Sequence, residues 1–243
     1  MVDQNQYYSN SRTQTAAEID EGLRAYMLTV YNYMASALAL TGLAAYVTAN
    51  TPALASLFFT AEGGRTGLGM ILFIVTIGLS FGISAGLNRM KASTVQILYW
   101  VFAVLFGVSL SYVLMIYTGV SIARTFFITA AAFGSLSIYG YTTKRNLAPL
   151  GTFLMMGLIG LLISGLVNAF FLQSTMLHFV TSAVGVLIFA GFTAYDTQKI
   201  KLWYDINDSH EVAKKKAIYG ALDLYLDFIL LFLHLLQFLG NRE

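Results

Sequence analysis

The chain has 243 residues, of which 57% are hydrophobic and only 11% are charged. Soluble domains carry roughly 25% charged residues, so this composition excludes an ordinary soluble protein and indicates a polytopic membrane protein. A net charge of +2 is too small to favour nucleic acid as a partner, and the absence of cysteine excludes disulfides and thiolate chemistry.

The first 24 residues are polar and lack the apolar stretch that a signal peptide needs. We therefore expect residues 1–24 to form a polar cytoplasmic tail, disordered over its first 22 residues, and membrane insertion to begin at an internal segment. Residues 25–243 are predicted to form a single transmembrane domain, because the connections between its apolar segments are short.

A membrane-spanning helix needs about 20 largely apolar residues, and seven segments reach that length. They are Ala25–Ala49, Gly67–Leu87, Val95–Tyr117, Ser121–Tyr141, Leu150–Leu172, Leu177–Asp196 and Ala217–Leu239. The sequence thus predicts an all-α fold with seven transmembrane helices. Small-residue spacings, such as Gly78, Gly82 and Gly86, predict close helix packing in lipid.

The uneven distribution of basic residues predicts the orientation of the chain. With the N-terminus inside, 11 of the 14 Lys and Arg residues are cytoplasmic, and only Arg65, Arg124 and Arg242 fall outside. Seven crossings then place the C-terminus on the other side. We expect a multi-pass protein of the inner (plasma) membrane with a cytoplasmic N-terminus and an external C-terminus.

Three aspartates belong to the last two apolar segments. Asp196 ends the sixth segment, and Asp223 and Asp227 lie inside the seventh. A carboxylate at the centre of a membrane helix costs at least about 2.5 kcal/mol, so such residues face a protein interior or a water cavity and are candidate functional groups. The expected topology puts all three in the cytoplasmic half, where Asp196 can meet one or both of the others.

Asp223 and Asp227 are four residues apart and share one helix face, on which His234 and Gln237 also lie. The other faces are mainly Leu, Ile and Phe, so we expect this last helix to be central in the bundle. Its polar stripe can line an ion path. His234, alone on an apolar segment, is expected to be a packed or hydrogen-bonded residue outside the site.

Two of the aspartates also have structural interpretations. Asp223 can be a residue near the helix start, favoured by the helix dipole and wetted from the cytoplasm. Asp196 can be a satisfied acid that pairs with Lys199 or an arginine. The depth of Asp227 argues against a comparable interpretation of that residue.

Two neighbouring carboxylates in a low-dielectric interior do not both stay ionised, and such a pair shares a proton and titrates in two steps. With one proton, a short Asp–Asp hydrogen bond latches the last two helices together. Loss of that proton loosens the latch or recruits a cation, and calcium prefers oxygen ligands, including carboxylates. The sequence therefore predicts a sensor of cytoplasmic pH that can bind calcium.

The segments Ala190–Lys201 (AGFTAYDTQKIK) and Leu222–Phe228 (LDLYLDF) resemble the bacterial branch of the Bax inhibitor-1 family, the transmembrane Bax inhibitor motif proteins. The resemblance extends over nearly the whole chain, and the YDTQ and LYLD motifs are specific to the family. It implies a seven-helix bundle with the last helix in the middle. It also implies a pH-sensitive calcium leak.

The resemblance assigns roles to individual residues. Asp196 of YDTQ and Asp227 of LYLD correspond to a di-aspartyl pH sensor in the ion path, which is also the expected metal-binding pair. Asp223 is a secondary residue of that path. Arg89, the only basic residue near the end of the second segment, is the candidate for a gating arginine that competes for the first aspartate.

The expected partners are calcium, protons and membrane lipid, with no resident cofactor and no enzymatic activity. The family's association with cell-death suppression in eukaryotes suggests an alternative for a bacterial member. This alternative is a non-conducting regulatory or stress-protection protein that binds other membrane proteins, for example a membrane protease.

A minor alternative is an intramembrane aspartyl protease. Such enzymes carry Tyr-Asp on one helix and Gly-x-Gly-Asp on the next, and this chain has Tyr195-Asp196 and Gly220-Ala-Leu-Asp223. Leu222 replaces the second glycine of that motif. The Pro-Ala-Leu tripeptide at Pro52 lies in an outside loop, away from the aspartates, so the sequence argues against a protease.

Overall fold

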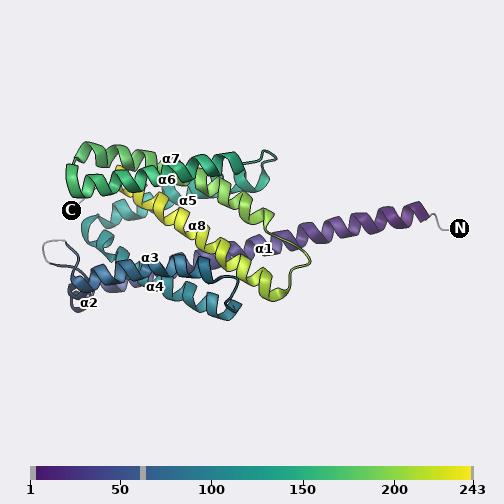
Figure 1. Ribbon diagram of the computed structural model, residues 1–243, viewed down its shortest axis with the longest axis horizontal. Coiled ribbons are helices and arrows are strands. Elements are labelled where there is room, and N and C mark those ends of the chain that lie inside the picture. The colour runs from purple at the N-terminus through teal and green to yellow at the C-terminus, as the bar shows by residue number, and fades with distance from the viewer. Residues whose placement is uncertain (1–3, 61–63, 242–243) are drawn as a thin grey trace.

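The computed structural model describes residues 4–60 and 64–241, with side chains from residue 20 onward (Figure 1). Its helices are α1 (Gln4–Ala49), α2 (Pro52–Phe58), α3 (Gly67–Gly86), α4 (Ala92–Ile116), α5 (Gly119–Thr142), α6 (Ala148–Val167), α7 (Thr175–Leu202) and α8 (His210–Leu239), and a short π-helix, η1 (Asn168–Leu172), continues α6. Over these ranges the only β-type pairing is an isolated bridge between Phe59 and Arg65.

Within the described ranges, seven helices are long and apolar enough to cross a membrane. They correspond one by one to the seven predicted segments, with α7 as the sixth and α8 as the seventh, so the all-α, seven-helix prediction is confirmed. The polar tail is not irregular as expected, because α1 already begins at Gln4. No glycine or proline precedes Gly22, so nothing in the tail interrupts the helix.

The ends of the last two spans also differ from the prediction. Helix α7 continues past Asp196 to Leu202, and α8 begins at His210 rather than Ala217. Ser209 caps α8 by accepting a hydrogen bond from the Val212 N–H at 3.3 Å. Hydropathy marks where a chain enters lipid, whereas capping and propensity decide where its helix ends.

Helix α8 is the centre of the bundle, as predicted. In Figure 1 it crosses diagonally between one group of helices, α1 to α4, and a second group, α5 to α7. It packs against α1, α4, α5 and α7. Leu222, Leu224, Tyr225 and Leu231 are almost completely buried along it. Most of the contact between the two groups therefore passes through α8.

The two ends of the chain lie at opposite ends of the molecule (Figure 1), as an odd number of crossings requires. The end of α8 is tied to the start of α5, because the Asn241 N–H donates to the Ser121 hydroxyl at 2.9 Å. Arg242, one of the basic residues expected outside, falls beyond the described residues.

The glycine-packing prediction was wrong for α3. A Cβ at Gly78 or Gly82 would meet no atom within 4 Å, so this face of α3 lies against no other helix. Close backbone approach occurs instead at Gly107, which lies on the Thr41 carbonyl of α1, and at Gly140, which lies on the Ala194 carbonyl of α7. Small residues hold α1 to α4 and α5 to α7.

These contacts give a test of the packing. Gly107→Val places a side chain against the backbone of α1 and is expected to destabilise the protein by about 1–3 kcal/mol, the usual cost of overpacking. Gly82→Val, the matched control, faces open space and is expected to leave stability unchanged. Thermal unfolding of the purified variants in detergent measures both, and equal unfolding temperatures would contradict this assignment.

Candidate functional site

The antiparallel contact between α7 and α8 positions the acidic residues. Gly185 of α7 lies directly on the ring of His234, and Gly220 of α8 lies against the Ile200 side chain. These glycines let the two helices approach closely near both ends of the contact. The chain between them, residues 203–209, is short, so the carboxyl-bearing turns of α7 and α8 come side by side.

Lys199 lies at the centre of the acidic cluster. Its ammonium donates to Asp196 Oδ1 at 2.7 Å and to Asp223 Oδ2 at 2.9 Å, and so bridges α7 to α8. It also lies 5.0 Å from the ring centroid of Trp203 and 5.7 Å from that of Tyr195. The side chain is 28% exposed, so its charge is only partly withdrawn from solvent.

Asp196 and Asp227 are brought together, as the sequence predicted. Both residues are buried, and their carboxyl groups lie within side-chain hydrogen-bonding range of each other. Asp227 Oδ2 is fully buried and receives no hydrogen bond. Two carboxylates are both acceptors, so only a proton shared between them turns this contact into a hydrogen bond and satisfies the pair.

Asp223 is the more exposed member of the cluster, and its partner is Lys199. The interpretation of Asp223 as a residue near a helix start is wrong, because α8 begins several turns earlier at His210. The alternative for Asp196, a pairing with Lys199, is present in the structure alongside its contact with Asp227. Asp196 therefore belongs both to an ion pair and to the carboxyl pair.

The remainder of the polar stripe also faces α7. His234 Nδ1 lies 2.8 Å from the Leu230 carbonyl oxygen, and its ring centroid is 5.3 Å from that of Phe189. Gln237 Oε1 accepts a hydrogen bond from the Ser182 hydroxyl at 2.9 Å. His234 is thus packed and hydrogen-bonded, as expected, and the stripe is covered by α7.

Arg89 is not brought to the aspartates. It is exposed in the turn between α3 and α4, and the ion pairs of the described residues do not include it. The basic residue beside Asp196 is instead Lys199, on the same helix. Its i,i+3 spacing from Asp196 was a visible signal, but its second bond to Asp223 depends on how α7 and α8 pack.

The described residues contain no group of three or more His, Asp or Glu side chains arranged to hold a metal ion. The acidic cluster holds the Lys199 ammonium. Calcium at Asp196 and Asp227 stays a prediction, and in this arrangement a divalent ion would need Lys199 to move.

Comparison with known proteins settles the family. Residues 23–243 match the family model described as "Inhibitor of apoptosis-promoting Bax1". The chain belongs to the Bax inhibitor-1 family. That family is not a family of enzymes.

Bacterial members of the Bax inhibitor-1 family resemble this chain over almost its full length. It is 51% identical to RP147 of Rickettsia prowazekii, with 97% of this chain and 98% of RP147 covered. It is 43% identical to a Caulobacter vibrioides protein, with both chains fully covered. It is 41% identical to the Escherichia coli K12 inner membrane protein YbhL, with 96% of this chain and 98% of YbhL covered. With its seven apolar helices, this similarity indicates a multi-pass inner membrane protein.

The hydrogen bonding of the cluster predicts how two isosteric variants differ. Asp227→Asn adds an amide donor where Oδ2 now receives none, so it is expected to unfold at the same or a higher temperature than the unchanged protein. Asp223→Asn removes a charged partner of Lys199 and is expected to destabilise by about 1 kcal/mol, the upper end for a partly exposed ion pair. Thermal unfolding at neutral pH measures both, and the reverse order would show that the polar partners are wrongly assigned.

Proposed function

We propose that this Bax inhibitor-1 family member is a pH-sensitive calcium leak channel, gated by the carboxyl pair of Asp196 and Asp227. The observation that carries the proposal is the unpartnered Asp227 oxygen beside the Asp196 carboxyl, inside the contact between α7 and α8. A proton satisfies that oxygen and joins the helices. Without the proton, the two carboxylates repel each other and attract a cation.

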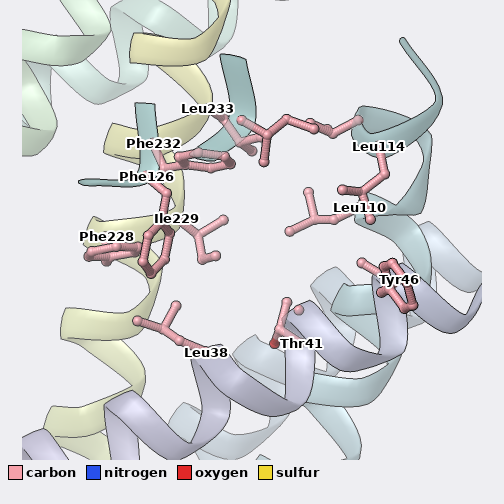
Figure 2. A pocket seen from close by; sticks show the side chains of 14 residues that line it. Leu38, Thr41, Tyr46, Leu110, Leu114, Phe126, Phe228, Ile229, Phe232 and Leu233 are labelled. Carbon is pink, nitrogen blue, oxygen red and sulfur yellow. The ribbon is translucent and has the colours of Figure 1, made fainter. Parts of the chain in front are cut away.

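The proposal requires α8 to move, and its opposite face has room. A cavity of about 230 Å³ lies between α1, α4, α5 and α8 (Figure 2). Leu38, Leu110, Phe126, Phe228 and Phe232 are among its apolar lining residues. Because a helix turns 100° per residue, Phe228 and Phe232 point away from the face that carries Asp227.

This geometry links the titration of the pair to a displacement. Repulsion between Asp196 and Asp227 pushes α8 from α7 towards the cavity, where apolar side chains have space to repack. An apolar constriction that wets when helices separate is a known way to gate ion flow. In this mechanism the proton holds the closed state, and a rise in pH opens the channel.

The sensor reads the cytoplasm if the basic residues set the orientation. With the N-terminus inside, the α7–α8 connection and the first turns of α8 are cytoplasmic, and Asp227 is the deepest of the three acids. The C-terminus is then outside. Calcium and protons are the species that this site handles, and lipid surrounds the bundle.

One feature favours the alternative of a non-conducting regulatory protein. The polar stripe of α8 is covered by α7, and the cavity on its other face is apolar. In that alternative the carboxyl pair and Lys199 only lock the bundle, and a partner such as a membrane protease receives the signal. A protease function has less support, because Asp223, the second acid of the protease-like motif, binds Lys199.

Calcium flux tests the proposed channel. In proteoliposomes between pH 6 and 8, the unchanged protein is expected to leak more calcium as pH rises, and Asp196→Asn and Asp227→Asn are expected to flatten that dependence. Asp223→Asn is expected to have the milder effect because it lies outside the carboxyl pair. An unchanged pH profile in both pair variants would remove the sensor, and no flux at any pH would favour the non-conducting alternative.

Thiol labelling tests the orientation, because the chain contains no cysteine. Single Lys144→Cys and Arg124→Cys variants place a thiol on exposed positions at opposite ends of α5. In intact cells, an impermeant maleimide is expected to label Arg124→Cys and to label Lys144→Cys only after the membrane is opened. The opposite pattern would invert the topology.

A further inference from the structure

We propose that Lys199 is a tethered counter-ion that competes with divalent cations for the aspartate cluster and so sets the concentration at which the cluster binds them. The Lys199 ammonium occupies the position between Asp196 and Asp223 that an entering cation would need. The consequence for flux rests on the proposed channel function, whereas the consequence for cation binding does not.

The contacts of Lys199 differ from those of the nearby lysines. Lys201 donates to the Tyr141 carbonyl at 2.8 Å and packs over the Tyr141 ring. Lys216 binds Asp208 at 2.6 Å and the Trp203 carbonyl at 3.0 Å. Among the described residues, Lys199 alone forms ion pairs with the aspartates of the α7–α8 contact.

The charge of the cluster explains the competition. Three ionised carboxyl groups and one ammonium give a net charge of −2, which one divalent cation neutralises. Without the ammonium the same carboxylates carry −3, and two carboxylate oxygens lose their hydrogen-bond donors. Loss of Lys199 therefore increases attraction for a cation and at the same time frees ligand atoms.

Lys199 is also built to move. It reaches the cluster through a flexible side chain that is 28% exposed, and its ammonium lies near the Trp203 ring at the end of α7. Rotation about its side-chain bonds takes the charge away from Asp223 without a change in backbone. A counter-ion that yields to the entering ion keeps binding weak, and ions must leave a conducting site as well as enter it.

Calcium binding to the purified full-length protein tests the proposal. Lys199→Met is expected to bind calcium at about tenfold lower concentration than the unchanged protein, as measured by equilibrium dialysis with radioactive calcium in detergent. Lys201→Met removes the same charge from the same helix outside the cluster, and its binding is expected to stay unchanged. Adding Asp223→Asn to Lys199→Met is expected to abolish the gain.

A chemical rescue supplies a second test. In the cysteine-free chain, Lys199→Cys is expected to bind calcium as tightly as Lys199→Met. Alkylation with 2-bromoethylamine restores an ammonium at nearly the length of lysine and is expected to return the affinity to its original value, whereas an uncharged alkyl reagent is not. Lys199→Gln, which keeps a hydrogen-bond donor but no charge, provides the same comparison if Lys199→Met fails to fold.

Equal calcium affinity in folded Lys199→Met or Lys199→Gln and in the unchanged protein would overturn the proposal. An equal gain in Lys201→Met would also overturn it, because the effect would then be one of general charge. Failure of the channel is distinguishable from this outcome. If proteoliposomes leak no calcium but Lys199→Met still binds it more tightly, the counter-ion stands and the channel does not.

Discussion

The structure depends on how α8 keeps its carboxyl groups in the middle of a bundle. This helix separates two groups of helices and packs against both, so its acids have no direct route to bulk water on most sides. Their polar partners come from α7 alone, through Asp196 and Lys199. The antiparallel α7–α8 contact, made close by Gly185 and Gly220, is therefore what allows this helix to be central.

The two faces of α8 are built differently, and this limits how the helix can move. Towards α7 it makes specific polar contacts that hold only at short distance, from Asp223 to Gln237. Towards α1, α4 and α5 it presents Phe228, Ile229 and Phe232 to an apolar cavity. Protein interiors are normally close-packed, so displacement towards this cavity meets less resistance than displacement towards α7. A change in charge on the polar face thus has a preferred mechanical outcome.

The sequence was sufficient for the seven helices and for the meeting of Asp196 with Asp227, since apolar length and helical spacing are local properties. It was insufficient for the ends of α7 and α8, because hydropathy reports lipid rather than hydrogen bonding. It misplaced the tight packing, because Gly78 and Gly107 look alike until the buried face of each helix is known. The position of Arg89 and the second bond of Lys199 depend on tertiary packing, which no local pattern encodes.

The charge of the cluster argues against a purely structural role. Buried ion pairs contribute little net stability, because desolvation offsets most of their attraction, and apolar residues of similar size serve as well. A structural cluster would at least balance its charges, as Lys216 and Asp208 do at the end of α8. Here three carboxyl groups face one ammonium, and Asp227 Oδ2 is buried without a donor. That imbalance costs free energy unless a proton or a cation completes the cluster, so the α7–α8 contact is built to exchange one with its surroundings.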